Sequence, residues 1–148
     1  MSSEFDSEPR NAAPQTTSTG RFSGEFELPL DPQAARLARR NVCDLLDSWH
    51  LEDELVRYDV ALVTSELVTN AIRHGGDKVT MHVAIDHDTV TVAVEDRADV
   101  MPLTLHVADP LAESGRGLAI VAAVADDWGV EPLKSGGKKV WARIAPRS

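Results

Sequence analysis

Three polar side chains that could do chemistry recur four residues apart in the middle of the chain: Glu66, Asn70 and His74. Residues four apart lie on the same face of an α-helix, so a carboxylate and a carboxamide can be directed at one bound object. The amide oxygen of Asn70 is a hard ligand that suits Mg²⁺. The carboxylate of Glu66 could accept a proton from a hydroxyl group or a water molecule. The spacing alone is a weak signal, because many solvated helix faces carry it.

An amphipathic helix is expected to carry these side chains. A stripe of apolar residues runs beside them at spacings of three and four: Val60, Val63, Leu67 and Ala71. That spacing is typical of the buried face of a helix. The sequence His-Gly-Gly at 74–76 ends the pattern, since glycine readily takes positive φ at a helix C-terminus. We therefore expect a helix from about Asp53 to His74.

A second candidate group, Asp96, ends a run of alternating residues. In Thr89–Asp96 the apolar positions are Val90, Val92 and Val94, and continued alternation puts Asp96 on their face. A carboxylate on the core side of a strand is costly unless a donor pairs with it. Two interpretations stay open. Asp96 marks the strand end and faces water or caps a loop, or it accepts a hydrogen bond from an exocyclic amine of a ligand.

A third candidate lies in the glycine-containing stretch SGRGLAIV at 114–121. It is predicted to form a glycine turn that leads into an apolar helix ending at about Ala125. Backbone N–H groups at such a helix start can cradle a phosphate, and Arg116 adds positive charge where an anion would sit. Most G-x-G sequences are ordinary turns. The preceding Arg97–Ser114 has no clear periodicity, and loops of this length are typically functional lids or disordered.

Five segments are predicted to form strands: Arg21–Leu28, Val79–Asp86, Thr89–Asp96, Asp127–Val130 and Lys139–Ile144. The first is typical of an edge strand, and the second and third alternate and are joined by a short turn, as in a hairpin. Asp31-Pro32 predicts the start of a further helix, which continues to about Trp49. One-sided strands beside amphipathic helices indicate an α+β fold. We expect a two-layer sandwich, with a mixed, mostly antiparallel sheet packed on about three helices.

Composition narrows the class of protein. The chain has 148 residues, of which 43% are hydrophobic, enough for one domain with a real core. Its net charge of −9 argues against direct nucleic-acid binding, which needs a basic surface, and it fits a protein partner with basic patches. The single cysteine, Cys43, rules out an internal disulfide and any multi-cysteine metal site.

The N-terminal residues 1–20 are rich in Ser, Thr, Pro, Glu and Asn, which predicts a disordered tail before a domain at 21–148. The first ten residues are acidic and lack the apolar region of a secretory signal. No apolar run approaches the roughly 20 residues that a membrane span needs. We therefore expect a cytoplasmic protein that does not act at a membrane.

Five motifs follow one another along the chain: TSELVTNAIRHGG, VAVED, SGRGLAIV, DWGV and GGKKVW. In this order they resemble the histidine-kinase-like ATPase domain, whose superfamily includes gyrase, MutL and sensor kinases. The resemblance covers about residues 21–145. It is greatest to the stand-alone branch related to anti-sigma factor serine kinases, in particular the small actinobacterial regulators. It implies a sheet packed on three helices, with ATP between the helices and a mobile lid, here Arg97–Ser114.

The resemblance also implies a role for each candidate residue. By position, Glu66 corresponds to the catalytic base and Asn70 to the Mg²⁺ ligand. Asp96 corresponds to the aspartate that accepts a hydrogen bond from the adenine amine. The glycine motif at 115–117 corresponds to the one beside the phosphates. The residues expected to contact ATP are then Asn70, Arg73, His74, Asp96, Gly115, Arg116, Gly117 and Leu118.

Two departures from the family pattern bear on nucleotide binding. The usual D-x-G-x-G reads DRADV at 96–100, so Ala98 and Val100 replace both glycines. Neither residue freely takes positive φ, and their side chains crowd the close approach of a ligand. Lys139 stands where relatives often place a threonine near the adenine. Either change could weaken nucleotide binding or shift its geometry.

Two functions follow from these features. The first is an ATP-dependent protein serine/threonine kinase that phosphorylates a small antagonist protein, in a partner switch that controls a sigma factor. The second is a binding module that binds nucleotide weakly or not at all and sequesters such a partner. Glu66 and Asn70 favour the enzyme, whereas Ala98 and Val100 favour the module. Relatives often dimerise, and the strand at 21–28 is one edge that could pair in a homodimer.

Overall fold

The computed structural model describes residues 15–18, 21–74, 78–97 and 113–147. Its helices and strands, in chain order, are β1 (Gln15–Ser18), β2 (Arg21–Leu28), α2 (Ala34–Ser48), α3 (Glu54–His74), β3 (Val79–Asp86), β4 (Thr89–Asp96), α4 (Glu113–Val124), β5 (Asp127–Pro132) and β6 (Lys138–Ile144). The five strands and three helices expected from the sequence are all present, and β1 is additional.

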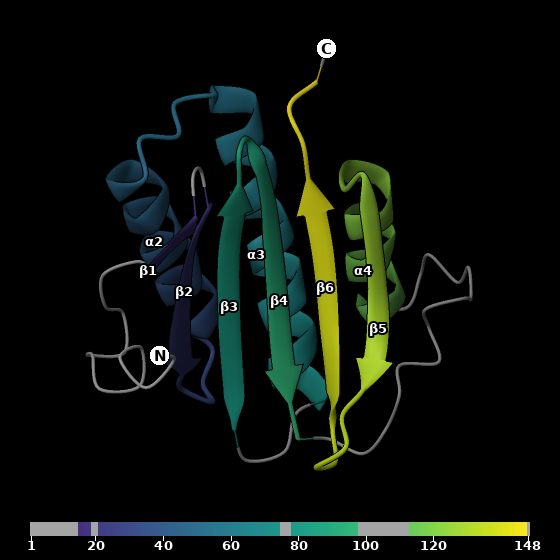
Figure 1. Cartoon of the computed structure of the whole chain (residues 1–148). Helices are drawn as coiled ribbons and strands as arrows, with labels where there is room; N and C mark the ends of the chain where they lie inside the picture. Colours follow the sequence, from purple (N-terminus) through teal and green to yellow (C-terminus); the bar gives the residue numbers. More distant parts are fainter. Residues whose placement is uncertain (1–14, 19–20, 75–77, 98–112, 148) are drawn as a thin grey trace.

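The strands form one six-stranded sheet in the order β1-β2-β3-β4-β6-β5 (Figure 1). Every neighbouring pair of strands in the described part of the chain is antiparallel. The expectation of a mostly antiparallel sheet is confirmed, but the expected parallel pairing is not found among these strands. The β3–β4 hairpin is confirmed. The last strand, β6, lies between β4 and β5 instead of at an edge, so the end of the chain pairs with the middle of the sheet.

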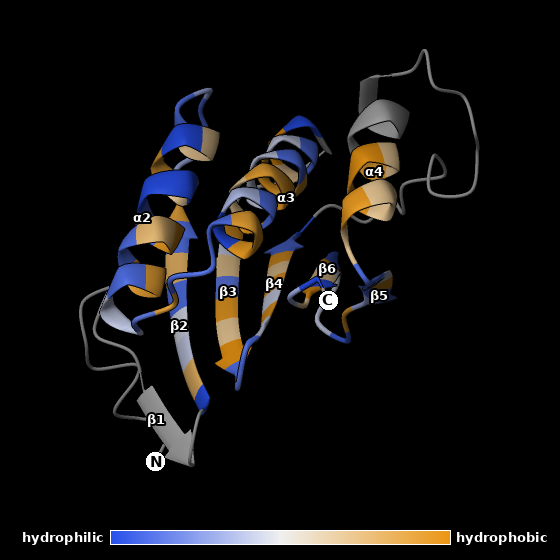
Figure 2. Cartoon of the chain, turned by 90° about the horizontal axis from the view of Figure 1, so that it is seen from above, coloured by the Kyte–Doolittle hydropathy of each residue, from blue (hydrophilic) through white to orange (hydrophobic). Residues whose placement is uncertain are grey.

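Helices α2, α3 and α4 all lie on one face of the sheet, which makes the predicted two-layer α+β sandwich (Figure 2). The strands that face them alternate between buried and more exposed residues, as a one-sided antiparallel sheet requires. The buried face of β3 and β4 consists of Val79, Met81, Val83, Ile85, Val90, Val92 and Val94. The orange, hydrophobic parts of the helices and strands in Figure 2 meet between the two layers.

Helix α3 lies against the middle of the sheet and packs against both other helices. Asp53 caps its first turn, since the Oδ1 atom accepts a 3.0 Å hydrogen bond from the Val56 N–H group. The predicted apolar stripe is buried: Val60, Val63, Leu67 and Ala71. The predicted bounds and orientation of this helix are thereby confirmed.

Strand β1 differs from the expectation of a disordered segment through residue 20. Gln15–Ser18 pairs antiparallel with the first residues of β2, Arg21–Ser23. The sequence QTTS has no apolar alternation that would mark it as a strand, and its extended form comes from this pairing. Strand β2 is therefore paired on both sides at its start. The rest of the predicted tail, residues 1–14 and 19–20, lies outside the described residues.

Two helix starts also differ from expectation. α4 begins at Glu113, so the glycine motif at 115–117 lies in its first turns and not in a turn before it. α2 begins at Ala34, and Asp31 accepts a 2.7 Å hydrogen bond from the Gln33 N–H group in the turn that precedes the helix. Residues 98–112 of the predicted lid lie outside the described residues.

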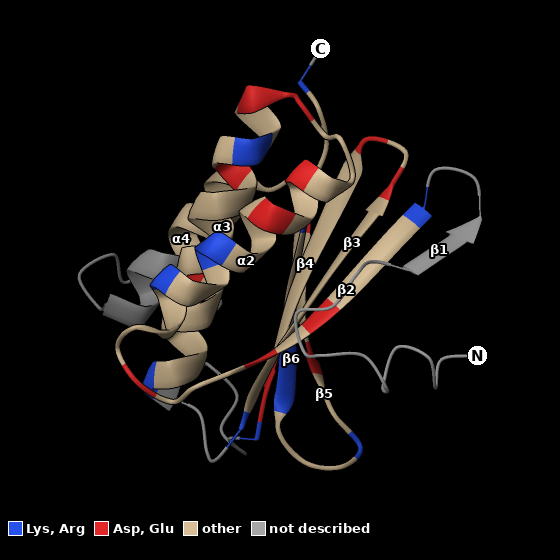
Figure 3. Cartoon of the chain, turned by 90° about the vertical axis from the view of Figure 1, so that its left-hand side faces the viewer, with Lys and Arg blue, Asp and Glu red and all other residues tan. Residues whose placement is uncertain are grey.

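Charged residues of both signs are spread over the helical layer (Figure 3). The exposed positions of α2 include Arg36, Arg40, Asp44 and Asp47. The exposed arginines of α2 are thus followed by exposed acidic residues one or two turns later. None of the helices in the described ranges is both long and apolar enough to cross a membrane.

Candidate functional site

Asn70 is a buried side chain whose polar atoms have no partner. It is 3% exposed, and neither its Oδ1 nor its Nδ2 atom makes a hydrogen bond to any described residue. An unpartnered buried polar group costs about 1–3 kcal/mol, so native proteins rarely leave one without a reason. A ligand that binds the amide oxygen would remove this cost. Asn70 is therefore a buried amide whose hydrogen-bonding capacity is left unused by the described residues.

Glu66 lies one turn before Asn70 on α3 and is partly buried. Burial raises the pKa of its carboxyl group above the ordinary value of 4.5, and the positive charge of Arg73 opposes this to a smaller extent. A raised pKa makes a carboxylate a better proton acceptor near neutral pH. The environment of Glu66 thus suits a general base.

Asp96 lies at the end of β4 on the face that the helices cover, and it is 2% exposed. The interpretation in which it faces water is therefore wrong. One of its oxygens, Oδ2, is 2.7 Å from the Nζ atom of Lys138, and both side chains are 1% exposed. The two residues are direct neighbours in the β4–β6 register. Asp96 is thus half of a buried ion pair that the sequence analysis did not predict.

A glycine turn places Lys138 beside Asp96. Gly136 and Gly137 have φ angles of 97° and 89°, in the left-handed region that glycine takes without strain. A Cβ atom on Gly137 would lie 2.0 Å from the carbonyl oxygen of Asp96, so no side chain fits there. The turn before β6 therefore lets the backbone of Gly137 pass directly against the end of β4.

The side chain of Lys139 does not face Asp96, although the sequence predicts Lys139 as the altered neighbour of a bound adenine. It pairs in register with Glu95 and its Nζ atom is 3.6 Å from a carboxylate oxygen of Glu131. Because side chains alternate along a strand, Lys139 points to the face of the sheet away from the helices. The departure that bears on the site is Lys138. The sequences VAVED and GGKK suggest that these two strands could pair, but only the correct register shows that Lys138 is opposite Asp96.

Of the remaining predicted site residues, the structure describes the side chains of only Arg73 and Leu118. Leu118 is 2% exposed and belongs to the core, where α4 packs on α3. Arg73 is exposed and borders a cavity of about 410 Å³ beside the start of α2, together with Leu30 and Ile72. Gly115, Arg116 and Gly117 belong to the first turns of α4. The side chains of His74 and Arg116 lie outside the described atoms.

The segments that carry the candidates converge on one end of the molecule. α3 and β4 both end toward the lower side of Figure 1, and α4 and β6 both begin toward it. Helix α3 packs against β4, β6 and α4, so it is adjacent to all the other elements of the site. The fold thus brings together motifs from Glu66 to Lys138 that are far apart in the sequence.

The donor set fits a magnesium nucleotide better than a metal held by protein alone. In the described ranges, no group of three or more His, Cys, Asp or Glu side chains could hold a metal ion. Mg²⁺ is usually held by one or two protein oxygens together with water and substrate phosphates. The unpartnered Oδ1 atom of Asn70 could supply such a protein oxygen.

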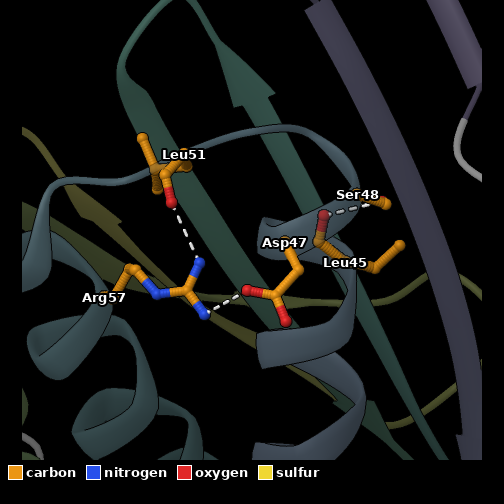
Figure 4. Close-up of polar contacts among 5 residues, drawn as sticks. All are labelled: Leu45, Asp47, Ser48, Leu51 and Arg57. Carbon is orange, nitrogen blue, oxygen red and sulfur yellow. Dashed lines mark hydrogen bonds and ion pairs between the residues drawn. The ribbon is translucent and has the colours of Figure 1, made fainter.

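A cavity of about 750 Å³ lies at the other end of α3 and shares no residue with this site. It surrounds the connection between α2 and α3, which Arg57 holds in place (Figure 4). The Arg57 guanidinium donates to the Leu51 carbonyl oxygen at 2.9 Å and to Asp47 at 2.6 Å. Through these contacts Arg57 stabilises the connection between α2 and α3, so its role is structural.

None of the curated protein sequences that were compared is significantly similar to this chain. The family description "Histidine kinase-like ATPase domain" matches residues 28–144, which is more than half of the 148 residues. The match includes α3, β4, α4 and β6, the elements that carry the site. The chain therefore belongs to the histidine kinase-like ATPase domain family.

Proposed function

We propose that this protein binds Mg²⁺-ATP and acts as a serine/threonine kinase toward a small antagonist protein in a partner switch. The observation that carries the proposal is the buried amide of Asn70, which lacks a partner among the described residues. A protein that acts only as a scaffold gains nothing from this cost. Membership of the ATPase family and the raised pKa of Glu66 support the same conclusion.

Each residue of the site has a distinct part in the proposed reaction. Mg²⁺-ATP would supply the phosphoryl group and the charge neutralisation that its transfer requires, and ADP would leave as the bond to the γ-phosphorus breaks. Asn70 holds the metal through its amide oxygen. Glu66 accepts the proton of the serine or threonine hydroxyl group as that oxygen becomes the nucleophile. The backbone N–H groups at the start of α4 hold phosphate oxygens, and the positive end of that helix favours their charge.

Calorimetric titration with ATP, with and without Mg²⁺, tests the binding step. The wild type is expected to bind Mg²⁺-ATP, and Asn70→Ala is expected to lose the Mg²⁺-dependent part of the affinity. Transfer of labelled γ-phosphate to a panel of purified small antagonist proteins tests the kinase step, with Glu66→Gln as the control. Binding without transfer to any of them would limit the function to nucleotide binding.

A second candidate function is a partner-sequestering module with weak nucleotide binding. The buried ion pair between Asp96 and Lys138 favours it, because the carboxylate expected to receive the base already has a charged partner. Ala98 and Val100 in place of glycines favour it as well. Absence of wild-type binding at millimolar ATP, together with capture of a sigma factor or an antagonist by the purified protein, would support this function.

A further inference from the structure

Lys138 is a charged residue at the site for which the proposed phosphoryl transfer has no use. It lies at the first position of β6, opposite Asp96 in register, and points to the face covered by the helices. We propose that Lys138 competes with the nucleotide base for Asp96, so that their ion pair lowers the affinity of the site for ATP. This inference rests on the proposed function, because it assumes that Asp96 receives the base.

The geometry gives Lys138 a direct hold on the carboxylate. Its Nζ atom is 2.7 Å from the Asp96 Oδ2 atom, within the range of a charge-assisted hydrogen bond. Both side chains are 1% exposed, so solvent does not screen the pair. The close contact of Gly137 with the Asp96 carbonyl oxygen brings the backbones together. The pair is therefore part of the folded sheet and does not depend on a surface rotamer.

A nucleotide base can bind this carboxylate only at a cost in free energy, because Lys138 already occupies it. The exocyclic amine of a purine is a neutral donor, and its hydrogen bond to a carboxylate is weaker than that of an ammonium group in the same position. If the base displaced Lys138, the ammonium group would be left buried without its counter-ion, which is strongly unfavourable. A threonine at this position would keep a hydroxyl donor for Asp96 and would carry no charge.

The chain contains a matched control in the next residue. Lys139 has the same charge and lies on the same strand, but it faces the opposite side of the sheet and pairs with Glu131. Substitution of either lysine changes the net charge equally. Only substitution of Lys138 removes the ion pair with Asp96.

The experiment is calorimetric titration of the full chain with Mg²⁺-ATP, for the wild type, Lys138→Thr and Lys139→Thr. Lys138→Thr is expected to bind at least tenfold more tightly than the wild type, whereas Lys139→Thr is expected to match it. Inosine triphosphate, which lacks the exocyclic amine, should show no such gain. If Lys138→Thr does not fold, Lys138→Gln replaces it, because the carboxamide keeps a donor without the charge.

The outcomes separate the two proposals. Tighter binding of ATP by Lys138→Thr supports the inference, including the case in which the wild type shows no binding. Wild-type binding that Lys138→Thr leaves unchanged or weakens overturns the inference alone and retains the ATP site; the lysine would then help to hold the base. Absence of binding by all variants overturns both the inference and the proposed function.

Discussion

Asn70 is a residue at which ligand binding and stability are expected to oppose each other. Its buried amide has no partner in the described part of the chain, so replacing it by the apolar Asn70→Leu removes an unsatisfied group. We expect the free energy of unfolding without ligand to rise by about 1–3 kcal/mol, while Mg²⁺-dependent ATP binding is lost. Urea unfolding and calorimetry measure the two effects.

Thr64→Val is the matched control for this prediction. The Thr64 hydroxyl is also buried on α3 without a partner among the described residues, but it has no assigned role. This variant should gain stability and keep its ATP affinity. A lower stability of Asn70→Leu would mean that the amide stabilises the ligand-free fold. That result would contradict the assignment of Asn70 as a residue whose amide is satisfied only when Mg²⁺-ATP binds.

Glu66 is expected to make stability depend on pH. Because the folded protein has the higher pKa, it binds more protons than the unfolded chain from about the ordinary value of 4.5 up to the raised value. The contribution of Glu66 to stability is therefore fully present below that window and is lost as the pH rises through it. Glu66→Gln should remove this slope, so its stability relative to the wild type increases from pH 4 to pH 7.

Unfolding by urea at several pH values measures this difference. Glu95→Gln is the control, since it removes the same charge from a side chain that lies on the face of the sheet away from the helices. If the difference between Glu66→Gln and the wild type were constant with pH, the carboxyl group would not have the environment of a general base.

The residue scale also shows what the sequence could predict. The positions of Glu66, Asn70 and Asp96 followed from local periodicity, because helix and strand spacing alone decides which face a side chain takes. The partner of Asp96 lies 42 residues away, and it depends on the register between β4 and β6. A shift of the register by one residue exchanges the two faces of a strand. The sequence alone therefore points to Lys139 as the lysine near the site, whereas the structure places Lys138 there.

At the scale of elements, the turn before β6 should be sensitive to a single methyl group. Gly137→Ala would place a Cβ atom 2.0 Å from the Asp96 carbonyl oxygen, at a residue with a φ of 89°. Both the clash with rigid backbone and the left-handed conformation are unfavourable, and each costs on the order of 1–3 kcal/mol. We expect a large loss in the free energy of unfolding and a weakened β4–β6 pairing.

Gly24→Ala provides the comparison. A Cβ atom at this position would lie 2.8 Å from the Cδ1 atom of Leu45, which is the end of a flexible side chain and can move aside. The stability of Gly24→Ala should therefore fall less than that of Gly137→Ala. Chemical denaturation of both variants tests the order, and a reversed order would contradict the position of the β6 turn.

Elements were predictable where their own sequence carries a pattern. The apolar stripe of α3 and the alternation of β3 and β4 are local, so both the type and the bounds of these elements were confirmed. β1 has no such pattern and exists through its pairing with β2. The glycines at 115 and 117 suggested a turn, yet the helix begins before them, because glycine is unfavourable in a helix by only about 1 kcal/mol.

At the scale of the whole molecule, the end of the chain is tied to α3 by a partly buried ion pair. Arg147 donates to the Asp59 carboxylate, whose side chain is only 9% exposed. The two residues are 88 positions apart, so the contact joins the segment after β6 to the first half of the domain. Replacing Arg147 leaves a largely buried carboxylate without this partner, and such a change costs about 1–3 kcal/mol.

Arg147→Met is therefore expected to lower the free energy of unfolding by about this amount, whereas Arg21→Met should change it by less than about 1 kcal/mol. The comparison is well matched, because the arginine is 55% exposed in both pairs and only the carboxylates differ: Asp86, the partner of Arg21, is 55% exposed and Asp59 is 9% exposed. Urea unfolding at low and at high salt distinguishes the two variants further. The effect of Arg147→Met should persist in high salt, because a buried carboxylate is screened less than an exposed one. Equal and salt-sensitive effects of the two variants would show that the end of the chain adds no more than a surface ion pair to the fold.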